Sequence, residues 1–283
     1  AWGIDLDLDG AIATSDRIAY DGNYGLSMSY VGAAKKAHER NEIHLTSGLF
    51  PVGTQFLSTV RYVDPQEDGT TKLSPRMKEV RLLEKSGWLN YAELEILGID
   101  EIKETSDFPD RVNLPYGTPE RGLSNQRAWR AYGFIEDSEG ELRPQTTEEL
   151  FNCIGCHGGL GATGDSIFSY RRKLNDQQFQ GGWFHWDQKG FTGINEPKTK
   201  YRPGRVQYEY TFYLMYTRGA DEYRANPEIE SRFIDMYGFL KSNMAEALHE
   251  DIGLLLYPSY ERALALNKSY YTIVEDQDYI YGR

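Results

Sequence analysis

The residues best suited to chemistry are two cysteines and a histidine that lie within five positions of one another. The segment reads Cys153-Ile154-Gly155-Cys156-His157, and it holds both cysteines of the 283-residue chain. On a helix, positions 153, 156 and 157 are related as i, i+3 and i+4, so both thiols and the imidazole share one face. That arrangement suits a porphyrin, because the thiols can form thioethers to its vinyl groups while the imidazole reaches the iron. The spacing therefore predicts one covalently bound haem, with Cys153 and Cys156 as attachment points and His157 as an axial ligand.

Other uses of the cysteine pair fit the sequence less well. A structural zinc site needs four ligands, and the chain has no second cysteine pair to complete one, although its scattered histidines could serve. A redox pair of the thioredoxin type follows a strand at the start of a helix, whereas here a capped helical turn precedes the cysteines. A disulfide between residues three apart would close a very short loop and stabilise almost nothing.

The helix that carries this motif is predicted from its start signals. Thr146 and Glu149 have the spacing of a capping box. The apolar residues Leu150, Phe151 and Ile154 then follow with helical spacing. The cysteine pair is therefore expected on a helix.

The remaining segments predict a mixed first part and a mostly helical second part. The expected elements are helices at 31–40, 74–89, 90–104, 207–218, 226–256 and 259–274, a strand at 55–63, a hairpin or loop at 133–143 and a glycine-rich loop at 158–193. Asn90 and Glu93 have the spacing of a capping box at the start of the helix expected at 90–104. The fold class expected is mainly α with some β. Residues 1–144 are expected to form an α+β region, and residues 145–283 a mainly helical haem c domain.

The segment from Leu150-Phe151 to Gly158-Gly159, with the motif between them, resembles the attachment helix of c-type cytochromes. The resemblance covers about 15 residues. It implies covalent haem, His157 as the proximal ligand, export before maturation and redox work. The chain departs from small soluble members of that family, because the Gly-Pro loop and the later proline-flanked Met ligand are not present in that form. The fold of the small members is therefore not carried over.

Three residues are candidates for the sixth iron position. His185 lies in an aromatic segment that could wall a haem and exclude water, either as a ligand or as a distal-pocket residue. Met215 and Met77 are the alternatives, although Met215 lies among aromatic residues typical of a packed helix. Arg171 and Arg172 are expected to pair with the haem propionates, because guanidinium groups suit planar carboxylates.

The beginning of the chain fits a calcium loop of about 12 residues. Acidic residues stand at loop positions 1, 3, 5 and 12, a glycine at position 6, and a residue able to offer its carbonyl oxygen at position 7: Asp5, Asp7, Asp9, Asp16, Gly10 and Ala11. The alternative is an exposed strand with aspartates on one face, ending at the Asp9-Gly10 turn.

Charge and hydropathy narrow the class of protein. The net charge of −12 argues against nucleic acid as a partner, since phosphate binding needs a concentrated basic face. No uncharged apolar run approaches the length of about 20 residues that a membrane span requires. The chain begins at Ala1 and looks processed, trimmed or cut from a longer protein. Covalent haem implies export, so we expect a bacterial-type periplasmic or extracellular protein.

The function expected from these features is single-electron transfer by a monohaem c-type cytochrome with redox proteins as partners. Two alternatives stay open. One is a peroxidase-like haem enzyme with an open sixth position, in which His185 acts as the distal acid–base group. The other is a haem-based redox or gas sensor. Nothing in the sequence fixes the oligomeric state.

Overall fold

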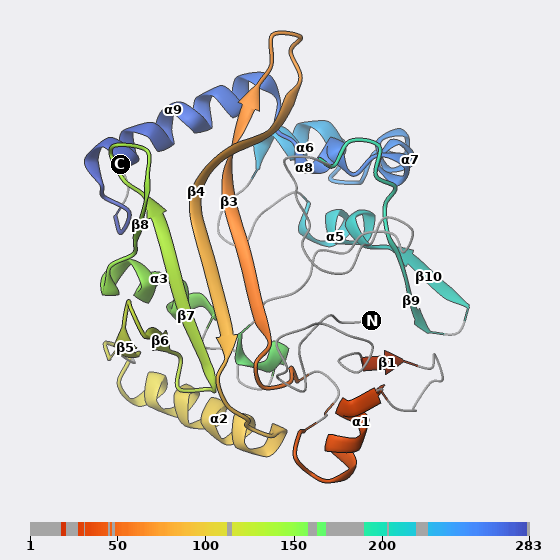
Figure 1. The fold of residues 1–283 in the computed structure, drawn as a ribbon. Helices are drawn as coiled ribbons and strands as arrows, with labels where there is room; N and C mark the ends of the chain where they lie inside the picture. Colours follow the sequence, from red (N-terminus) through yellow and green to blue (C-terminus); the bar gives the residue numbers. More distant parts are fainter. Residues whose placement is uncertain are drawn as a thin grey trace. The chain divides into compact units, whose positions relative to one another are not determined.

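The computed structural model describes residues 18–20, 28–30, 32–44, 46, 49–111, 115–157, 163–167, 190–202, 204–218 and 226–281 (Figure 1). The chain forms two compact units. Unit 1 comprises Ala1–Val60, Met77–Tyr170 and Tyr271–Arg283, and unit 2 comprises Arg61–Arg76 and Arg171–Tyr270. The domain boundary expected from the sequence after residue 144 stays a prediction.

The main element is an antiparallel six-stranded sheet. Five strands follow the order β3 (Gln55–Pro65), β4 (Thr71–Lys85), β7 (Trp129–Glu136), β6 (Gly122–Ser124) and β5 (Tyr116–Thr118), and β8 (Leu142–Pro144) also pairs with β7. The long strands β3, β4 and β7 run side by side in Figure 1. Residues Arg61–Arg76, which include the end of β3 and the start of β4, belong to unit 2.

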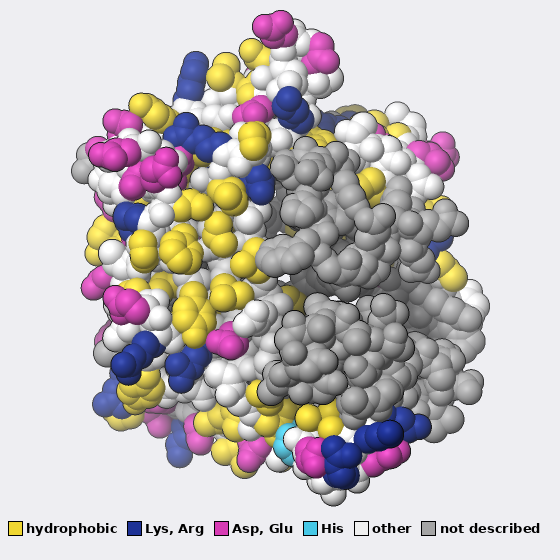
Figure 2. Space-filling view, viewed as in Figure 1, with side chains coloured by type: hydrophobic (Ala, Val, Ile, Leu, Met, Phe, Trp, Pro, Cys, Tyr) yellow, Lys and Arg dark blue, Asp and Glu magenta, His cyan; other side chains and the backbone are white. Residues whose placement is uncertain are grey.

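Strand β7 has the alternation expected of a sheet with one buried face. Trp129, Ala131 and Ile135 are buried, whereas Arg130 and Phe134 are exposed. Because side chains alternate across a strand, the buried set lies on one face of the sheet. In Figure 2, hydrophobic side chains gather over the visible part of the sheet, and charged side chains of both signs lie around them.

Short helices and one further hairpin complete the described part of unit 1. The hairpin pairs β1 (Ile18–Tyr20) with β2 (Met28–Tyr30), and the helical segments are α1 (Gly32–Glu39), α2 (Tyr91–Asp107), α3 (Thr147–His157) and the short 3-10 helix η2 (Thr163–Ser166). Helix α2 begins with the capping box expected from the sequence, since Asn90 and Glu93 bond each other's backbone N–H groups.

The described part of unit 2 is mostly helical. It contains a hairpin of β9 (Lys198–Arg202) and β10 (Arg205–Tyr208), followed by α5 (Glu209–Thr217), α6 (Pro227–Phe233), α7 (Ser242–Glu250), α8 (Gly253–Leu256) and the start of α9 (Tyr260–Asp276). One core cluster of this unit consists of Leu214, Ile229, Phe233 and Leu248, which come from three different helices, and a second consists of Phe191, Ile194 and Ile252.

The expected fold class is wrong. The described chain is α+β and is built on the antiparallel sheet, and no helical haem domain is apparent among the described residues. The helix expected at 74–89 is instead strand β4, because residues Glu79–Lys85 pair one by one with β7. Cross-strand pairing outweighs local helix propensity in such a segment. The long helix expected at 226–256 is divided into α6, α7 and α8.

Several local expectations are confirmed. Strand β3 covers the segment expected at 55–63, and α9 covers the helix expected at 259–274. The hairpin expected at 133–143 is formed by β7 and β8, with Asp137 accepting hydrogen bonds from the N–H groups of Glu139 and Glu141 at its tip. Each of these signals lies within a few residues of the structure it predicts.

Candidate functional site

Helix α3 carries the cysteine motif in its last two turns. It covers Thr147–His157, so positions 153, 156 and 157 lie on one helix with i, i+3 and i+4 spacing, as the sequence predicted. The side chains of Cys153, Cys156 and His157 lie outside the described residues.

The start of α3 is fixed by a capping box and an arginine. The Thr146 N–H donates to Glu149 Oε2 at 2.8 Å, and the Glu149 N–H donates to Thr146 Oγ1 at 3.3 Å, which confirms the capping pair. Arg143 in the middle of β8 adds a bidentate contact, with Nη1 and Nη2 at 2.9 and 2.8 Å from the two Glu149 carboxylate oxygens. A planar bidentate pair of this kind fixes orientation as well as position.

Close packing holds the same helix against the sheet. Leu150 is buried, and it lies next to Gly133 in the middle of β7. A Cβ added at Gly133 would come within 3.2 Å of Leu150 Cδ2 and 1.7 Å of Gln145 Oε1, so a side chain here would have to displace the end of the Gln145 side chain and press on Leu150. The N-terminal half of α3 is therefore seated firmly on β7.

The chain is held again soon after the motif, at η2. Asp165 is fully buried and receives the Lys85 Nζ at 2.6 Å on each carboxylate oxygen. The Phe50 N–H also donates to Asp165 Oδ2 at 2.9 Å, and Trp129 Nε1 donates to the Asp165 carbonyl oxygen at 2.9 Å. Four hydrogen bonds from three other parts of unit 1 thus converge on one residue.

The hydrogen bonds to Asp165 hold a segment whose backbone is strained. Asp165 and Ser166 have φ angles of 55° and 56°, in the left-handed region that side chains other than glycine rarely adopt. Asn125 stabilises the second residue by donating from Nδ2 to the Ser166 carbonyl oxygen at 3.1 Å. Such strain persists only where surrounding contacts fix the conformation.

The ion pair between Lys85 and Asp165 lies in an apolar and aromatic setting. Both side chains are fully excluded from solvent, and the Lys85 Nζ lies 5.3 Å from the ring centre of Trp129 and 5.7 Å from that of Trp88. Burial lowers the pKa of Lys85 and raises the pKa of Asp165, and the hydrogen bonds between them oppose both shifts. Two aromatic faces add a cation–π contribution to the charged form of the lysine.

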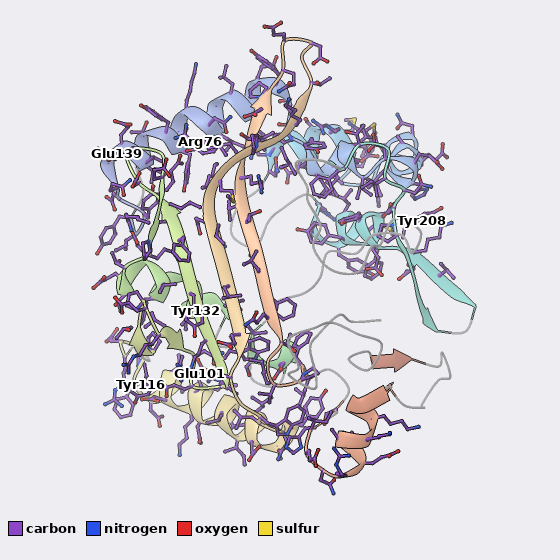
Figure 3. The ribbon with its side chains drawn as sticks, viewed as in Figure 1. Arg76, Glu101, Tyr116, Tyr132, Glu139 and Tyr208 are labelled. Carbon is purple, nitrogen blue, oxygen red and sulfur yellow. The ribbon has the colours of Figure 1, made fainter. Side chains whose placement is uncertain are left out.

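Further bonds make the sheet under α3 rigid. Tyr132, which projects from β7 (Figure 3), donates from its hydroxyl to Glu84 Oε2 of β4 at 3.2 Å. Arg127, just before β7, pairs with Glu101 of α2. The cysteine motif thus lies at the end of a helix whose start is fixed on a braced sheet, and η2, which begins six residues after His157, is a second fixed point.

The other candidate residues are placed as follows. Met77 is a half-buried residue of strand β4 in unit 1 and not part of a helix start. Met215 belongs to α5 of unit 2, and its side chain is 61% exposed. His185, Arg171 and Arg172 lie outside the described residues, as do the residues of the proposed calcium loop, Asp5, Asp7, Asp9, Ala11 and Asp16.

Sequence reasoning missed the Lys85–Asp165 pair. The two residues are 80 positions apart, and neither belongs to a motif of known spacing. A hint was present only in Asp165, which is an acidic residue in a short Gly-Asp-Ser segment after the motif. Its partner depends on the pairing of β4 with β7, which the sequence did not reveal.

Among the described residues, no group of three or more His, Cys, Asp or Glu side chains is arranged to hold a metal ion. None of the described helices is both long enough and apolar enough to cross a bilayer.

Comparison with known proteins identifies the family. A lipoprotein family matches residues 6–250, and the chain belongs to it. An uncharacterized lipoprotein of Aquifex aeolicus (strain VF5) is 29% identical over an alignment of 303 residues, which covers 93% of this chain and 48% of the relative. The chain therefore spans about half the length of that relative. No solved structure matches the chain.

This family membership corrects the predicted identity. The interpretation of the chain as a c-type cytochrome is wrong, because the matched family is one of lipoproteins and the match covers most of the chain. The resemblance to cytochromes depended on about 15 residues, and a short motif indicates local chemistry without fixing the fold that carries it.

The predicted function is corrected with it. Electron transfer by a cytochrome, the peroxidase-like enzyme and the haem sensor all lack support from the family and from its uncharacterized relative. The description of the chain as a cytochrome c of electron transport is wrong on the same findings. The prediction of export is confirmed in its coarser form, since the family indicates an exported, membrane-anchored protein.

Proposed function

We propose that this chain is a haem-binding segment of an exported lipoprotein, with one haem attached through Cys153 and Cys156 and with His157 as an axial ligand. The observation that carries this proposal is the placement of positions 153, 156 and 157 along the last turns of one anchored helix. Haem bound in this way supplies an iron centre whose potential depends on its ligands and on burial.

The contacts of unit 1 support the proposal by fixing the chain on both sides of the motif. Before it, Arg143 and Glu149 hold the first turn of α3. After it, Lys85 holds Asp165 against β4. A haem attached by two thioethers needs both sulfur atoms at fixed positions beneath one ring edge, and a helix held at its start and followed by a second anchor meets that need.

The decisive experiment asks whether the pigment is covalent. The chain is expressed with an export signal in bacteria that mature c-type haem proteins, beside a c-type cytochrome that controls for maturation. Wild-type protein should keep its haem absorption after denaturation and acid-acetone extraction. Replacement of Cys153 and Cys156 by Ala should remove it.

The matched control replaces His249, a histidine of helix α7 in unit 2, by Ala, and this variant should keep its haem. Freely extractable pigment would show that the haem is not covalent. Wild-type protein without haem, in cells where the control cytochrome matures, would show that the proposal is wrong.

The finer predictions belong to the same proposal. They concern the sixth ligand (His185, Met215 or Met77) and the propionate partners (Arg171 and Arg172). The spin state of the ferric protein with each candidate ligand replaced by Ala would identify the sixth ligand. A redox protein as partner, and a lack of nucleic-acid binding, stay predictions.

We propose the periplasm as the location of this segment, because covalent haem is attached after export. Protease treatment of intact cells and of cells with a permeabilised outer membrane distinguishes a periplasmic protein from one on the cell surface. Digestion only after permeabilisation is expected, whereas digestion in intact cells would indicate the cell surface.

Calcium at the first loop is a separate proposal, carried by the spacing of Asp5, Asp7, Asp9 and Asp16. A ligand that binds only the folded state must stabilise it. Calcium should therefore raise the melting temperature of chelator-treated protein, and Asp5→Asn with Asp9→Asn should abolish the rise. No rise in the wild-type protein would leave the strand-and-turn alternative.

A further inference from the structure

A tight turn between α6 and α7 presents three large apolar side chains to solvent. Met236, Tyr237 and Phe239 are 88%, 75% and 70% exposed. Single exposed apolar residues are common on protein surfaces, but three within four positions on one turn are not explained by that background.

The turn is held rigidly by its backbone. The Asp235 carboxylate accepts hydrogen bonds from the N–H groups of Tyr237 and Phe239 at 2.8 and 2.9 Å. Ile234 and Leu240 form an antiparallel bridge at its base, and the Asp235 N–H donates to the Phe239 carbonyl oxygen at 2.8 Å. Gly238 has a φ of +84°, which the closed turn requires.

This rigidity matters for binding. The apolar side chains are displayed on a backbone whose conformation is already fixed, so little backbone entropy is lost when they are buried. The base of the turn belongs to the core of unit 2, because Ile234 and Leu240 pack against the cluster that contains Phe233 and Leu248. The three exposed side chains therefore lie on a turn whose base packs against the core of unit 2.

Basic side chains lie next to the apolar tip. The Arg218 guanidinium is close enough to Gly238 that an added Cβ would meet its Nη1 at 3.2 Å. Lys241 lies two residues after Phe239 and donates from Nζ to the Ser231 carbonyl oxygen at 2.6 Å. An apolar and aromatic tip flanked by cations matches the chemistry of an anionic lipid surface, where aromatic rings settle at the headgroup level.

We propose that the turn Asp235–Phe239 is a membrane-contact site that inserts Met236, Tyr237 and Phe239 into the headgroup region of an anionic bilayer. The family indicates a membrane-anchored protein, so a bilayer is the surface nearest to this chain. Anchoring raises the effective concentration of that surface, and a weak second contact then becomes sufficient to orient unit 2. The proposal does not depend on haem.

The first test measures co-sedimentation of the 283-residue chain, without a lipid anchor, with vesicles of phosphatidylethanolamine and phosphatidylglycerol. Tyr237→Ser with Phe239→Ser should weaken partitioning by about tenfold or more, equivalent to about 1.4 kcal/mol. The matched control is Tyr116→Ser with Tyr281→Ser, which removes two other exposed aromatic rings, 70% and 89% exposed, and should leave partitioning unchanged. Vesicles of phosphatidylcholine alone should bind less, since Arg218 and Lys241 then lose their anionic partners.

A second measurement locates the tip. Phe239→Trp keeps an aromatic ring in place, and the difference in fluorescence between this variant and the wild-type chain should shift to shorter wavelength with vesicles and be quenched by brominated lipids. No binding by the wild-type chain, or an equal loss in the control variant, would overturn the proposal. A dimer in sedimentation velocity that Tyr237→Ser with Phe239→Ser dissociates would assign the turn to a second copy of the chain instead.

Discussion

The segment at Asp165 buries two charges, whereas the turn at Asp235–Phe239 exposes three large apolar side chains. Both reverse the usual preference of each group for water or for the interior. In the first region the reversal is compensated by partners inside unit 1, because the charges satisfy each other and accept or donate further hydrogen bonds. In the second region the apolar side chains are exposed in the described part of the chain, and the proposed contact with a bilayer would bury them. The first arrangement therefore contributes to folding, and we propose that the second contributes to binding.

The largest expected effect follows from breaking the buried pair. Asp165→Ala leaves the Lys85 ammonium buried among aromatic rings without its carboxylate. An uncompensated buried charge typically costs about 3–5 kcal/mol, so we expect the free energy of unfolding to fall by that amount. Urea denaturation followed by circular dichroism measures it.

Two variants control this prediction. Glu42→Ala breaks the exposed pair between Arg40 and Glu42 and should leave the free energy of unfolding nearly unchanged, because water screens such a pair. Lys85→Met with Asp165→Leu removes both charges and should be less destabilised than Asp165→Ala alone. Equal losses in the single and double variants would show that shape, and not the unpaired charge, determines the cost.

A smaller effect is expected at the start of α3. Burial raises the pKa of Glu149, but the hydrogen bonds from Arg143 and from the Thr146 N–H outweigh it, so the pKa lies below its ordinary value. A lowered folded-state pKa stabilises the folded protein above the unfolded-state pKa of about 4.3, and this contribution is lost as pH falls through the folded-state pKa. Arg143→Ala should cost about 1.5–3 kcal/mol at neutral pH.

The pH dependence distinguishes this pair from simple packing. Stability of the wild-type chain should fall more steeply than that of Arg143→Ala as pH drops below about 4.3, because the wild type has both of the Arg143 contributions that lower the Glu149 pKa to lose. Parallel stability curves for the two proteins across that window would contradict the assignment.

The capping box of α3 should contribute less than the arginine. Thr146→Ala removes the acceptor for the Glu149 N–H and should cost about 1 kcal/mol. Asn90→Ala at the capping box of α2 is the matched control, with a similar loss of stability. Under the haem proposal, Thr146→Ala should reduce the covalently bound haem recovered from cells, and Asn90→Ala should not. Equal haem yields from the two variants would show that the capping box of α3 does not contribute to haem attachment.

The smallest effect on stability is expected at the exposed turn. Tyr237→Ser with Phe239→Ser removes rings that contact mostly water, so the free energy of unfolding should change by less than about 0.5 kcal/mol. Thermal melting of the two proteins without lipid checks this. A large loss would mean that the rings stabilise the fold, and the contrast between the two regions would disappear.

The sequence by itself determined features whose cause is local. The capping boxes at Asn90 and Thr146 were predicted correctly, because each depends on two residues three positions apart. The tip of the β7–β8 hairpin and the helix under the cysteine motif were predicted for the same reason. The chemistry of Cys153, Cys156 and His157 is also a matter of local spacing, and it stays a prediction.

Tertiary structure alone decided the sheet and the anchors of the motif. A helix is expected over residues 74–89, yet residues up to Lys85 form strand β4, and Glu79–Lys85 pair with β7 across more than 40 positions. The same pairing carries Lys85 to Asp165, 80 positions away, and no spacing rule connects the two. The free energy of folding that these contacts contribute depends on which distant segments come together, and local sequence patterns do not show this. The motif therefore revealed the chemistry available at one helix face, whereas the fold around that face depended on long-range pairing.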